Sequence, residues 1–427
     1  MIALALFLLL FVLILLRVPV AFSIIISGLV GLLCFLSIEG VFGVMEIIPI
    51  NSVRSLSLSA IPLFILMAHL LLLSGMMDAL FSSARAVFGR MPGASGVAST
   101  VAGVGFSAVT GSSTAAAATL AQTTAPHMIK EGYRPAAATG MVAAVGTLAG
   151  MIPPSVILVF YAVTAEANVG DIIVAGIVPG LIIAAALALT MFLPILRDRT
   201  SVPRGQKVHW SVKLHSLLGA APVVVIFVVV VGLIYFGITT PTESAAAGCL
   251  VSFILVLVMK KATAHGLFTA VLETVKTSAM IFAIVIAAKV FGYAFALTRG
   301  AEVLVKWVSG LPVGPLVVIL LLMVLFVILG FFMDQIAIIA LTVPIVLPVV
   351  VALGYDDIWF GVFIVLMGEI GLITPPLGLN VFVVARASGR DTVEVFRGAV
   401  PYVIAMLVVG VLFAVWPQIV TWLPSTM

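Results

Sequence analysis

Apolar runs long enough to cross a lipid bilayer follow one another along the chain. A transmembrane helix needs about 20 mostly apolar residues, because about 30 Å of hydrocarbon is covered at about 1.5 Å per residue. The first run is followed by Arg17 without a small-residue cleavage site, so we expect it to be a retained span and not a signal peptide. The pattern predicts spans at 1–16, 18–36, 57–75, 136–164, 172–196, 216–238, 241–259, 277–298, 360–385 and 399–423.

Two further apolar stretches, 93–128 and 313–351, are too long for one span and are interrupted in the middle. The interruptions read FSAVTGSST (Phe106 to Thr114) and GFFMDQ (Gly330 to Gln335). Periodicity alone leaves open whether each stretch is two ordinary spans or a re-entrant hairpin. The interruptions and the repeat described below favour hairpins. The expected fold is therefore an all-α polytopic membrane protein of about ten spans plus two re-entrant helical hairpins.

Composition supports a membrane protein and excludes several other classes. Hydrophobic residues make up 63% of the 427 residues and charged residues 8%, against about 45–50% and about 25% in soluble domains. Lys and Arg are spread along the chain without a dense basic stripe, so we expect no nucleic-acid partner. Cys34 and Cys249 show neither disulfide nor zinc spacing. No GxxxxGK[ST] loop and no HExxH occur, so we expect neither ATP hydrolysis nor enzyme activity.

The charges of the loops predict an orientation. If both interrupted stretches return to their side of origin, one set of loops holds most Lys and Arg, including those of 197–213. The opposite set holds only Arg54, Arg299 and Lys306, together with many acidic residues. The positive-inside rule then places the cation-rich loops in the cytoplasm and both termini in the periplasm. Counting each interrupted stretch as two full spans would leave every loop and both termini on the same sides.

An internal repeat appears when the sequence is shifted along itself by 222 residues. It aligns residues whose backbone roles are hard to replace: Pro126 with Pro348, Gly146 with Gly368, Pro153-Pro154 with Pro375-Pro376, Gly176 with Gly398, and Pro179 with Pro401. The charges that follow the aligned Gly132-Tyr133 and Gly354-Tyr355 differ in sign, so the copies are expected to have opposite orientations. Inverted repeats are typical of secondary transporters.

The repeat divides the chain into expected domains. These are N-terminal scaffold helices (1–56), a first repeat (57–196), a basic cytoplasmic loop with scaffold helices (197–276) and a second repeat (277–427). Each repeat holds a hairpin, 93–128 or 313–351, and then a span broken by Pro-Pro, 136–164 or 360–385.

The proline breaks have the chemistry of ion sites. Proline removes a donor and clashes with the preceding turn, so the carbonyls of 146–151 and 368–373 lose helical partners. In a membrane such backbone persists only against protein, water or a bound ion. Neutral oxygen ligands suit Na⁺ better than a divalent cation, which calls for several carboxylates. A pair of kinks that serve packing only is the alternative.

We therefore predict two or more bound Na⁺ ions at equivalent places in the repeats, with the solute between the hairpin tips. The first ion site would use Ser107, Thr110, Gly111, Ser112 and Ser113 with carbonyls of Gly146, Thr147 and Gly150. The second would use Gly330, Asp334, Gln335, Gly368, Gly371 and Thr374. A carboxylate solute would meet half-helix N-termini and bound Na⁺, beside Ser112, Thr114, Pro153, Ser155, Thr374, Pro375 and Asn380.

Three other polar residues lie within predicted spans. Glu369 has two equal interpretations, a proton carrier or a structural hydrogen bond to the unwound segment. For Lys289 an ion pair between helices or a snorkelling side chain is favoured. His69 is expected to be a core group and not a ligand.

Seven motifs follow one another along the chain: RVPVAF (17–22), AIPLFILMAHLLLLSG (60–75), TGSSTAAAATL (110–120), EGYRPAAATG (131–140), IPPS (152–155), TPTESAAAG (240–248) and TPPLGLN (374–380). Taken together, they resemble the large membrane subunit of TRAP (tripartite ATP-independent periplasmic) transporters. One departure is that the first hairpin continues as STAAAAT where many relatives carry another polar or acidic residue.

The resemblance implies an elevator-type carrier of the bacterial inner membrane that imports organic acids, such as dicarboxylates or sialic acids, with Na⁺. It also implies a small membrane subunit of about four helices and a periplasmic substrate-binding protein. We expect the small subunit on scaffold spans rich in small residues such as Gly28, Gly31 and Gly232. A stand-alone Na⁺/anion symporter and a passive channel or scaffold are the alternatives.

Overall fold

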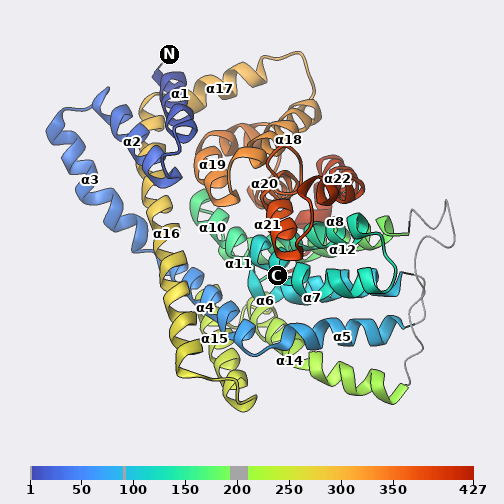
Figure 1. Cartoon of the computed structure of the whole chain (residues 1–427). Helices are drawn as coiled ribbons and strands as arrows, with labels where there is room; N and C mark the ends of the chain where they lie inside the picture. Colours follow the sequence, from blue (N-terminus) through green and yellow to red (C-terminus); the bar gives the residue numbers. More distant parts are fainter. Residues whose placement is uncertain (1, 90–92, 193–209) are drawn as a thin grey trace.

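The protein is built from helices that pack side by side (Figure 1). The computed structural model describes residues 2–89, 93–192 and 210–427, and these ranges contain no β-strand. The expected all-α class is therefore confirmed. Most of the predicted basic loop 197–213 lies outside the described residues.

The helices of the first half follow the predicted spans closely, with two additions. Arg17, with a positive φ of 63°, separates the first two helices, and Ser37 begins the third by accepting a hydrogen bond from the amide of Gly40. The helices are α1 (Ile2–Leu15), α2 (Val20–Leu33), α3 (Ile38–Val53), α4 (Ala60–Leu73), α5 (Met76–Phe88), α6 (Ala94–Thr110), α7 (Ser113–Lys130), α8 (Pro135–Gly146), α9 (Leu148–Met151), α10 (Val156–Ala165), α11 (Val169–Ala175) and α12 (Ile177–Thr190).

In the second half, a capping box of Thr240 and Glu243 begins one span, and Gly389, with φ of 65°, ends another. The helices are α14 (Trp210–Tyr235), α15 (Pro241–Val258), α16 (Ala264–Leu297), α17 (Gly300–Ser309), α18 (Pro315–Phe332), α19 (Gln335–Ala352), α20 (Asp357–Gly371), α21 (Leu379–Ser388), α22 (Thr392–Val415) and α23 (Gln418–Thr421).

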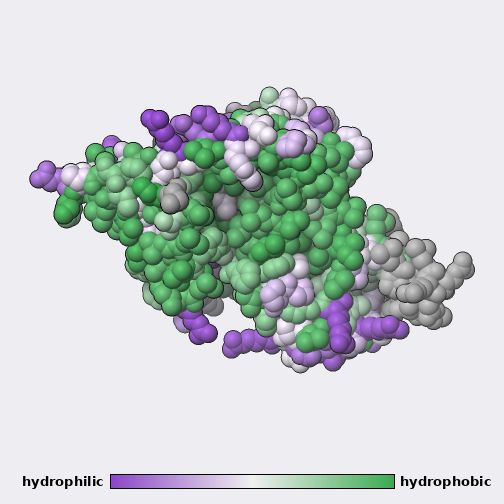
Figure 2. Space-filling model, turned by 90° about the horizontal axis from the view of Figure 1, so that it is seen from above, coloured by the Kyte–Doolittle hydropathy of each residue, from purple (hydrophilic) through white to green (hydrophobic). Residues whose placement is uncertain are grey.

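Several helices are long and apolar enough to cross a membrane, in agreement with the predicted polytopic fold. By length and composition, 7 described helices are able to cross a membrane, or 8 if the bent pair formed by 135–151 and 156–165 is one span. The predicted spans 1–16 and 18–36 are present as shorter helices of 14 residues each. Figure 2 shows a broad hydrophobic surface whose hydrophilic residues gather mainly along two opposite edges.

The repeat of 222 residues reappears in the helix boundaries. Adding 222 to the bounds of α7 gives the bounds of α19, and the breaks before them coincide as well. Helices α8 and α20 begin at equivalent residues, and α10 and α21 differ by one residue. Both Pro-Pro bonds, Pro153-Pro154 and Pro375-Pro376, are cis. Each repeat thus contains two helices joined at a polar tip, followed by two half-helices around a Pro-Pro break.

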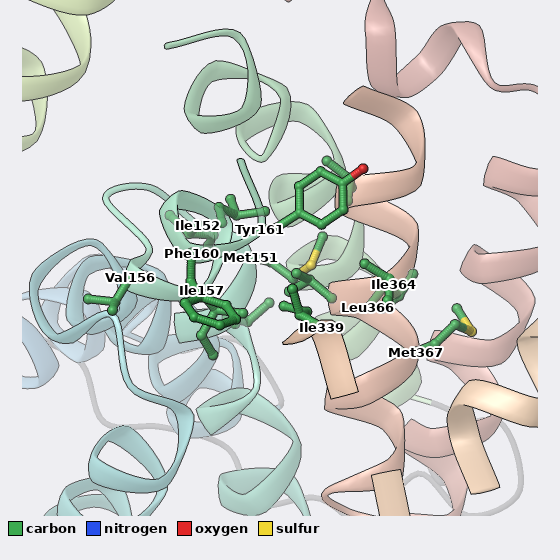
Figure 3. Packing of buried hydrophobic residues seen from close by; sticks show 14 of the residues in the cluster. Met151, Ile152, Val156, Ile157, Phe160, Tyr161, Ile339, Ile364, Leu366 and Met367 are labelled. Carbon is green, nitrogen blue, oxygen red and sulfur yellow. The ribbon is translucent and has the colours of Figure 1, made fainter. Parts of the chain in front are cut away.

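The two repeats interlock, because extensive helix contacts run between the copies as well as within them. Helix α8 packs against α22, α7 against α21, and α10 against both α19 and α20. Figure 3 shows part of this interface, with Met151 and Phe160 from the first repeat near Ile339 and Ile364 from the second. The 34-residue α16 runs along the side of this body and also contacts α2, α3 and α4 (Figure 1).

Glycines of the N-terminal helices serve this packing. A Cβ at Gly28 would lie 3.0 Å from the Phe291 backbone of α16, and one at Gly31 would lie 2.8 Å from Leu6 of α1. These two glycines therefore pack against other helices of the same chain, which corrects the expectation that a partner subunit packs against them. Gly232 of α14 has open space around it and stays available for that contact.

Contacts between distant loops agree with the predicted sorting of loops into two sides. Arg85 forms an ion pair of 2.6 Å with Glu131, and both belong to the cation-rich set. On the acidic side, Thr242 donates to the carbonyl of Leu56 (3.1 Å), and the hydroxyls of Tyr235 and Thr426 lie 3.1 Å apart. Each contact joins segments that the loop charges assign to one side.

Candidate functional site

The tips of both hairpins meet at one cavity of about 330 Å³, here called the hairpin cavity. Residues 110–115 of the first tip and 334–336 of the second line it. Leu379 and Val156, which begin the half-helices after the two breaks, add to the wall. Side chains from α4 and α16 close the remaining side. The cavity therefore lies where both repeats and the long α16 come together, as a solute between the hairpin tips requires.

Helix N-termini surround the hairpin cavity. First-turn residues of α7, α10, α19 and α21 all belong to its wall. Ser112 caps α7 by accepting from the amide of Ala115 (3.5 Å), and Asp334, its equivalent in the repeat, caps α19 by accepting from Ala337 (2.7 Å). The N-terminus of a helix carries a partial positive charge and unpaired amide groups. The cavity thus presents several helix N-termini to an anion, although its described wall contains no Lys or Arg and includes the carboxyl group of Asp334.

A buried carboxylate joins the two repeats beneath the cavity. Glu369 of α20 is fully buried, and its Oε1 accepts a hydrogen bond from the hydroxyl of Ser113 at the first hairpin tip. The side chain of Gln335, at the second tip, interacts with the same carboxylate. A Cβ at Gly150, on the first broken span, would lie 1.9 Å from this Oε1. The Oε2 atom has no hydrogen-bond partner, which is unusual for a buried carboxylate.

The predicted second ion site is partly assembled. A Cβ at Gly330 would lie 2.8 Å from the Cα of Gly371, so hairpin and broken span touch backbone to backbone. Gly368 lies beside Gln335, whose Nε2 donates to the carbonyl of Val365 (3.0 Å) while its Oε1 has no partner. Asp334 lies apart from this contact and faces the hairpin cavity. Thr374 stays next to it, because its amide donates to the carbonyl of Gly371 (3.1 Å) and its hydroxyl to that of Ile370 (2.5 Å).

The predicted first ion site is also divided. Gly111, with φ of 54°, lies against the first break, since a Cβ there would be 3.2 Å from both the Pro154 carbonyl oxygen and the Val156 nitrogen. Gly146 packs instead against the backbone of Ala117 in α7. Two other predicted ligands donate their hydroxyls within their own segment, Thr110 to the carbonyl of Phe106 (3.2 Å) and Thr147 to the carbonyl of Ala144 (2.5 Å). Ser107 is buried, and its hydroxyl has no hydrogen-bond partner.

The predicted solute contacts fall into two groups. Ser112 and Thr114 line the hairpin cavity, with their hydroxyls 3.3 Å apart. Ser155 lies behind the wall and donates to the carbonyl of Gly150 (2.7 Å), which occupies one of the carbonyls freed by the first break. Asn380 is also behind the wall, fully buried, and both polar atoms of its amide lack hydrogen-bond partners. Of the prolines, Pro153 is buried and Pro375 is exposed, and neither lines the cavity.

Two predicted interpretations of single residues have different outcomes. Lys289 forms the expected ion pair between elements, with Glu166 at the end of α10. His69 is half-buried on the wall of the hairpin cavity, so the expectation that it is only a core group is wrong. Sequence reasoning left Glu369 outside both ion sites. Its position before the second break was the available signal, but its contact with Ser113 spans 256 residues and required the tertiary structure.

Comparison with known proteins gives a consistent result. A family model described as "Tripartite ATP-independent periplasmic transporter, DctM component" matches residues 7–419. The chain is 32% identical over 403 residues to a C4-dicarboxylate TRAP transporter large permease protein of Pseudomonas aeruginosa, covering 91% of this chain and 93% of the relative. It is 31% identical to a sialic acid TRAP transporter large permease protein of Vibrio cholerae, covering 95% of each chain.

More distant similarities extend this comparison. An ectoine/5-hydroxyectoine TRAP transporter large permease protein of Ruegeria pomeroyi is 28% identical over 99% of this chain and 98% of the relative. The crystal structure of the YdaH transporter of Alcanivorax borkumensis superposes with a TM-score of 0.69 over 90% of each chain at 17% identity, a similarity of fold alone.

Proposed function

The chain belongs to the DctM component family of tripartite ATP-independent periplasmic (TRAP) transporters, and we propose that it imports a small organic anion together with sodium ions. The observation that carries the proposal is the hairpin cavity, which combines helix N-termini from both repeats with a wall that holds no Lys or Arg among its described residues. The named solutes of its relatives include C4-dicarboxylates, sialic acid, ectoine and isethionate. All of these bear a carboxylate or sulfonate group.

The oxygen atoms around the cavity support the proposed coupling to sodium. The Oε1 of Gln335 and the Oε2 of Glu369 are buried without hydrogen-bond partners, close to the tips of both hairpins. A buried oxygen without a partner costs free energy unless a cation or water occupies the place. With a cation bound beside it, Glu369 supplies one negative charge, and the hairpin tips and breaks supply neutral oxygens, a set that suits a monovalent cation.

Two sodium ions, one per repeat, are proposed on the basis of the equivalent breaks. The first ion takes its ligands from the first tip and break, and the second from Gln335, the 368–371 backbone and Thr374. Bound ions add positive charge next to the helix N-termini, so the anion binds well only after sodium. This coupling is reciprocal, because the solute then tightens sodium binding by the same factor.

The proposed transport cycle uses the repeat architecture. The body formed by the two repeats carries the hairpin cavity, and it moves as an elevator against scaffold helices that include α2, α3 and α16. A periplasmic binding protein delivers the solute, and a small membrane subunit of about four helices covers part of the scaffold, for which the open surface around Gly232 is a suitable position. The protein lies in the bacterial inner membrane with both termini in the periplasm, as the loop charges indicate.

Uptake into proteoliposomes tests the proposal. The reconstituted complex is supplied with labelled succinate, N-acetylneuraminate or isethionate, with and without an inward Na⁺ gradient. Saturable uptake that requires both Na⁺ and the binding protein is expected. Uptake without a binding protein would favour a stand-alone symporter. Linear, Na⁺-independent flux would contradict carrier function and indicate a channel.

A further inference from the structure

A second cavity, of about 500 Å³, lies further along the helices that form the hairpin cavity, and we call it the lysine cavity. Its wall includes Lys289 and Tyr293 of α16, Thr164 and Glu166 at the end of α10, and Asn51 of α3. It is therefore formed between the outer helices and the body of the two repeats. None of its residues belongs to the proposed ion sites or solute contacts.

The two cavities follow one another along the same helices. On α16, Thr277 and Ile281 line the hairpin cavity, whereas Val285 and Lys289 line the lysine cavity. Residues four apart lie on one face of a helix, about 6 Å further along its axis, so one continuous face of α16 serves both cavities. Helices α10 and α19 repeat this order: their first turns line the hairpin cavity, and later residues, including Pro344, line the lysine cavity. The same three helices also contact one another.

Lys289 is the one Lys or Arg among the described residues that line either cavity. Its ammonium pairs with Glu166, whose side chain is 78% exposed. The hydrogen bond from Lys289 lowers the pKa of the Glu166 carboxyl, which therefore stays ionised at neutral pH. An exposed pair of this kind holds its partners weakly. A carboxylate from solution can replace the carboxylate of Glu166 without leaving either charge buried and unpaired.

We propose that the lysine cavity is an entrance site for the transported organic anion, in which the anion's carboxylate or sulfonate displaces Glu166 from Lys289. The inference rests on the proposed function and deepens it by assigning the first binding step. Asn51, Thr164 and Tyr293 offer amide and hydroxyl groups to the uncharged part of the solute. From Lys289 the anion passes along the shared face of α16 to the helix N-termini of the hairpin cavity. The loop holding Glu166 belongs to the acidic, periplasmic set, which is the side from which an imported solute arrives.

Three substitutions separate an anion site from a purely structural ion pair. Lys289→Gln removes the positive charge, Lys289→Arg keeps it, and Glu166→Gln removes only the competing carboxylate. An anion site requires opposite effects from the two glutamine variants. We expect Lys289→Gln to raise the half-saturating solute concentration about tenfold, and Glu166→Gln to lower it about threefold. Lys289→Arg should stay near wild type. Lys306→Gln, on the exposed α17, is the matched control and should change nothing.

The measurements use the full reconstituted complex with succinate, N-acetylneuraminate and isethionate as probes at saturating Na⁺. Uptake gives the half-saturating concentration, calorimetry on the solubilised complex gives Kd, and the melting temperature shows that each variant is folded. If both glutamine variants shift affinity in the same direction, or neither does, while wild type still shows Na⁺-dependent uptake, the pair is structural and this inference alone is overturned. A wild-type complex that transports none of the probes overturns the proposed function as well.

Discussion

Replacement of Gly398 by alanine is expected to loosen the joint between the two repeats. Helices α8 and α22 cross there with their backbones in contact: a Cβ at Gly398 would lie 1.7 Å from the carbonyl oxygen of Ala136 and 3.2 Å from the Cα of Gly140. A carbon and an oxygen in contact are about 3.3 Å apart. The helices must therefore separate by about 1.5 Å, because no side-chain rotation moves a Cβ or a carbonyl oxygen.

The expected magnitude is the difference between two effects. Overpacking against rigid neighbours costs about 3 kcal/mol, near the upper end for such changes. Alanine regains about 1 kcal/mol over glycine through its helix propensity. The net loss of about 2 kcal/mol corresponds to a melting temperature lowered by roughly 2 °C, because the unfolding entropy of a 427-residue chain is about 0.9 kcal/mol/K. Uptake should fall as well, because this crossing fixes how the broken spans face each other.

Thermal unfolding of the purified protein in detergent, followed by intrinsic tryptophan fluorescence, measures the shift. Gly43→Ala is the matched control, because Gly43 lies inside α3 with no atom within 4 Å of an added Cβ. That variant should melt at or slightly above the wild-type temperature. If Gly398→Ala melted together with Gly43→Ala, the close crossing of α8 and α22 would be refuted.

Further predictions concern the ions and the first hairpin tip. Glu369→Gln should raise the half-saturating Na⁺ concentration for uptake at least about tenfold, because it removes the carboxylate proposed to pair with the bound ion. Ser113→Ala should have a smaller effect in the same direction, and equal Na⁺ titrations for wild type and both variants would contradict this role. Thr374→Ala or Ser112→Ala should lower the Hill coefficient of the Na⁺ titration of uptake from above one toward one. A wild-type coefficient near one that neither substitution alters would contradict the two-site arrangement. Gly111→Ala should reduce saturable uptake while the protein still inserts, because φ of 54° strains any residue with a side chain and an added Cβ would lie 3.2 Å from the carbonyl oxygen of Pro154. Normal uptake by this variant would exclude a tight tip.

Much of the fold could be predicted from sequence because its signals are local. The polar interruptions at Gly111-Ser112 and at Asp334 coincide with the breaks between α6 and α7 and between α18 and α19. A glycine with positive φ or a side-chain cap next to a long apolar run is enough to end one helix and begin the next. The shift of 222 residues found from prolines and glycines also matches the helix boundaries, since those residues determine where helices end.

Helices α3, α5 and α17 were not predicted, and two of them show the physical reason. Helix α3 contains Glu39, Glu46 and Pro49, so its hydropathy falls below that of a span, and it packs along α16. Helix α17 is short and amphipathic, with Glu302 in its first turn. Neither has the uniform apolar character by which spans are recognised. Both form because tertiary contacts with larger helices stabilise an amphipathic face.

The site was only partly predictable because its contacts join residues far apart in sequence. Local patterns identify polar tips and proline breaks, and Ser112 and Gln335, which were named from those patterns, both line the hairpin cavity. They do not reveal that Glu369 reaches Ser113, or that Gly111 lies on Pro154 and not on Gly146. Those relations depend on how the repeats interlock, which the repeated sequence alone does not specify.

The distribution of charge along the proposed route gives a reason for strict coupling to sodium. A fixed Lys or Arg in the hairpin cavity would bind an organic anion without any ion, and the loaded carrier could then move without sodium. Here the fixed cation, Lys289, lies at the entrance, where attraction speeds capture. The deeper cavity relies on helix N-termini, whose partial charges are weaker than a full cation. In the proposed mechanism, tight binding there requires the charge of bound sodium, so the anion reaches its transported state only when the ions are present.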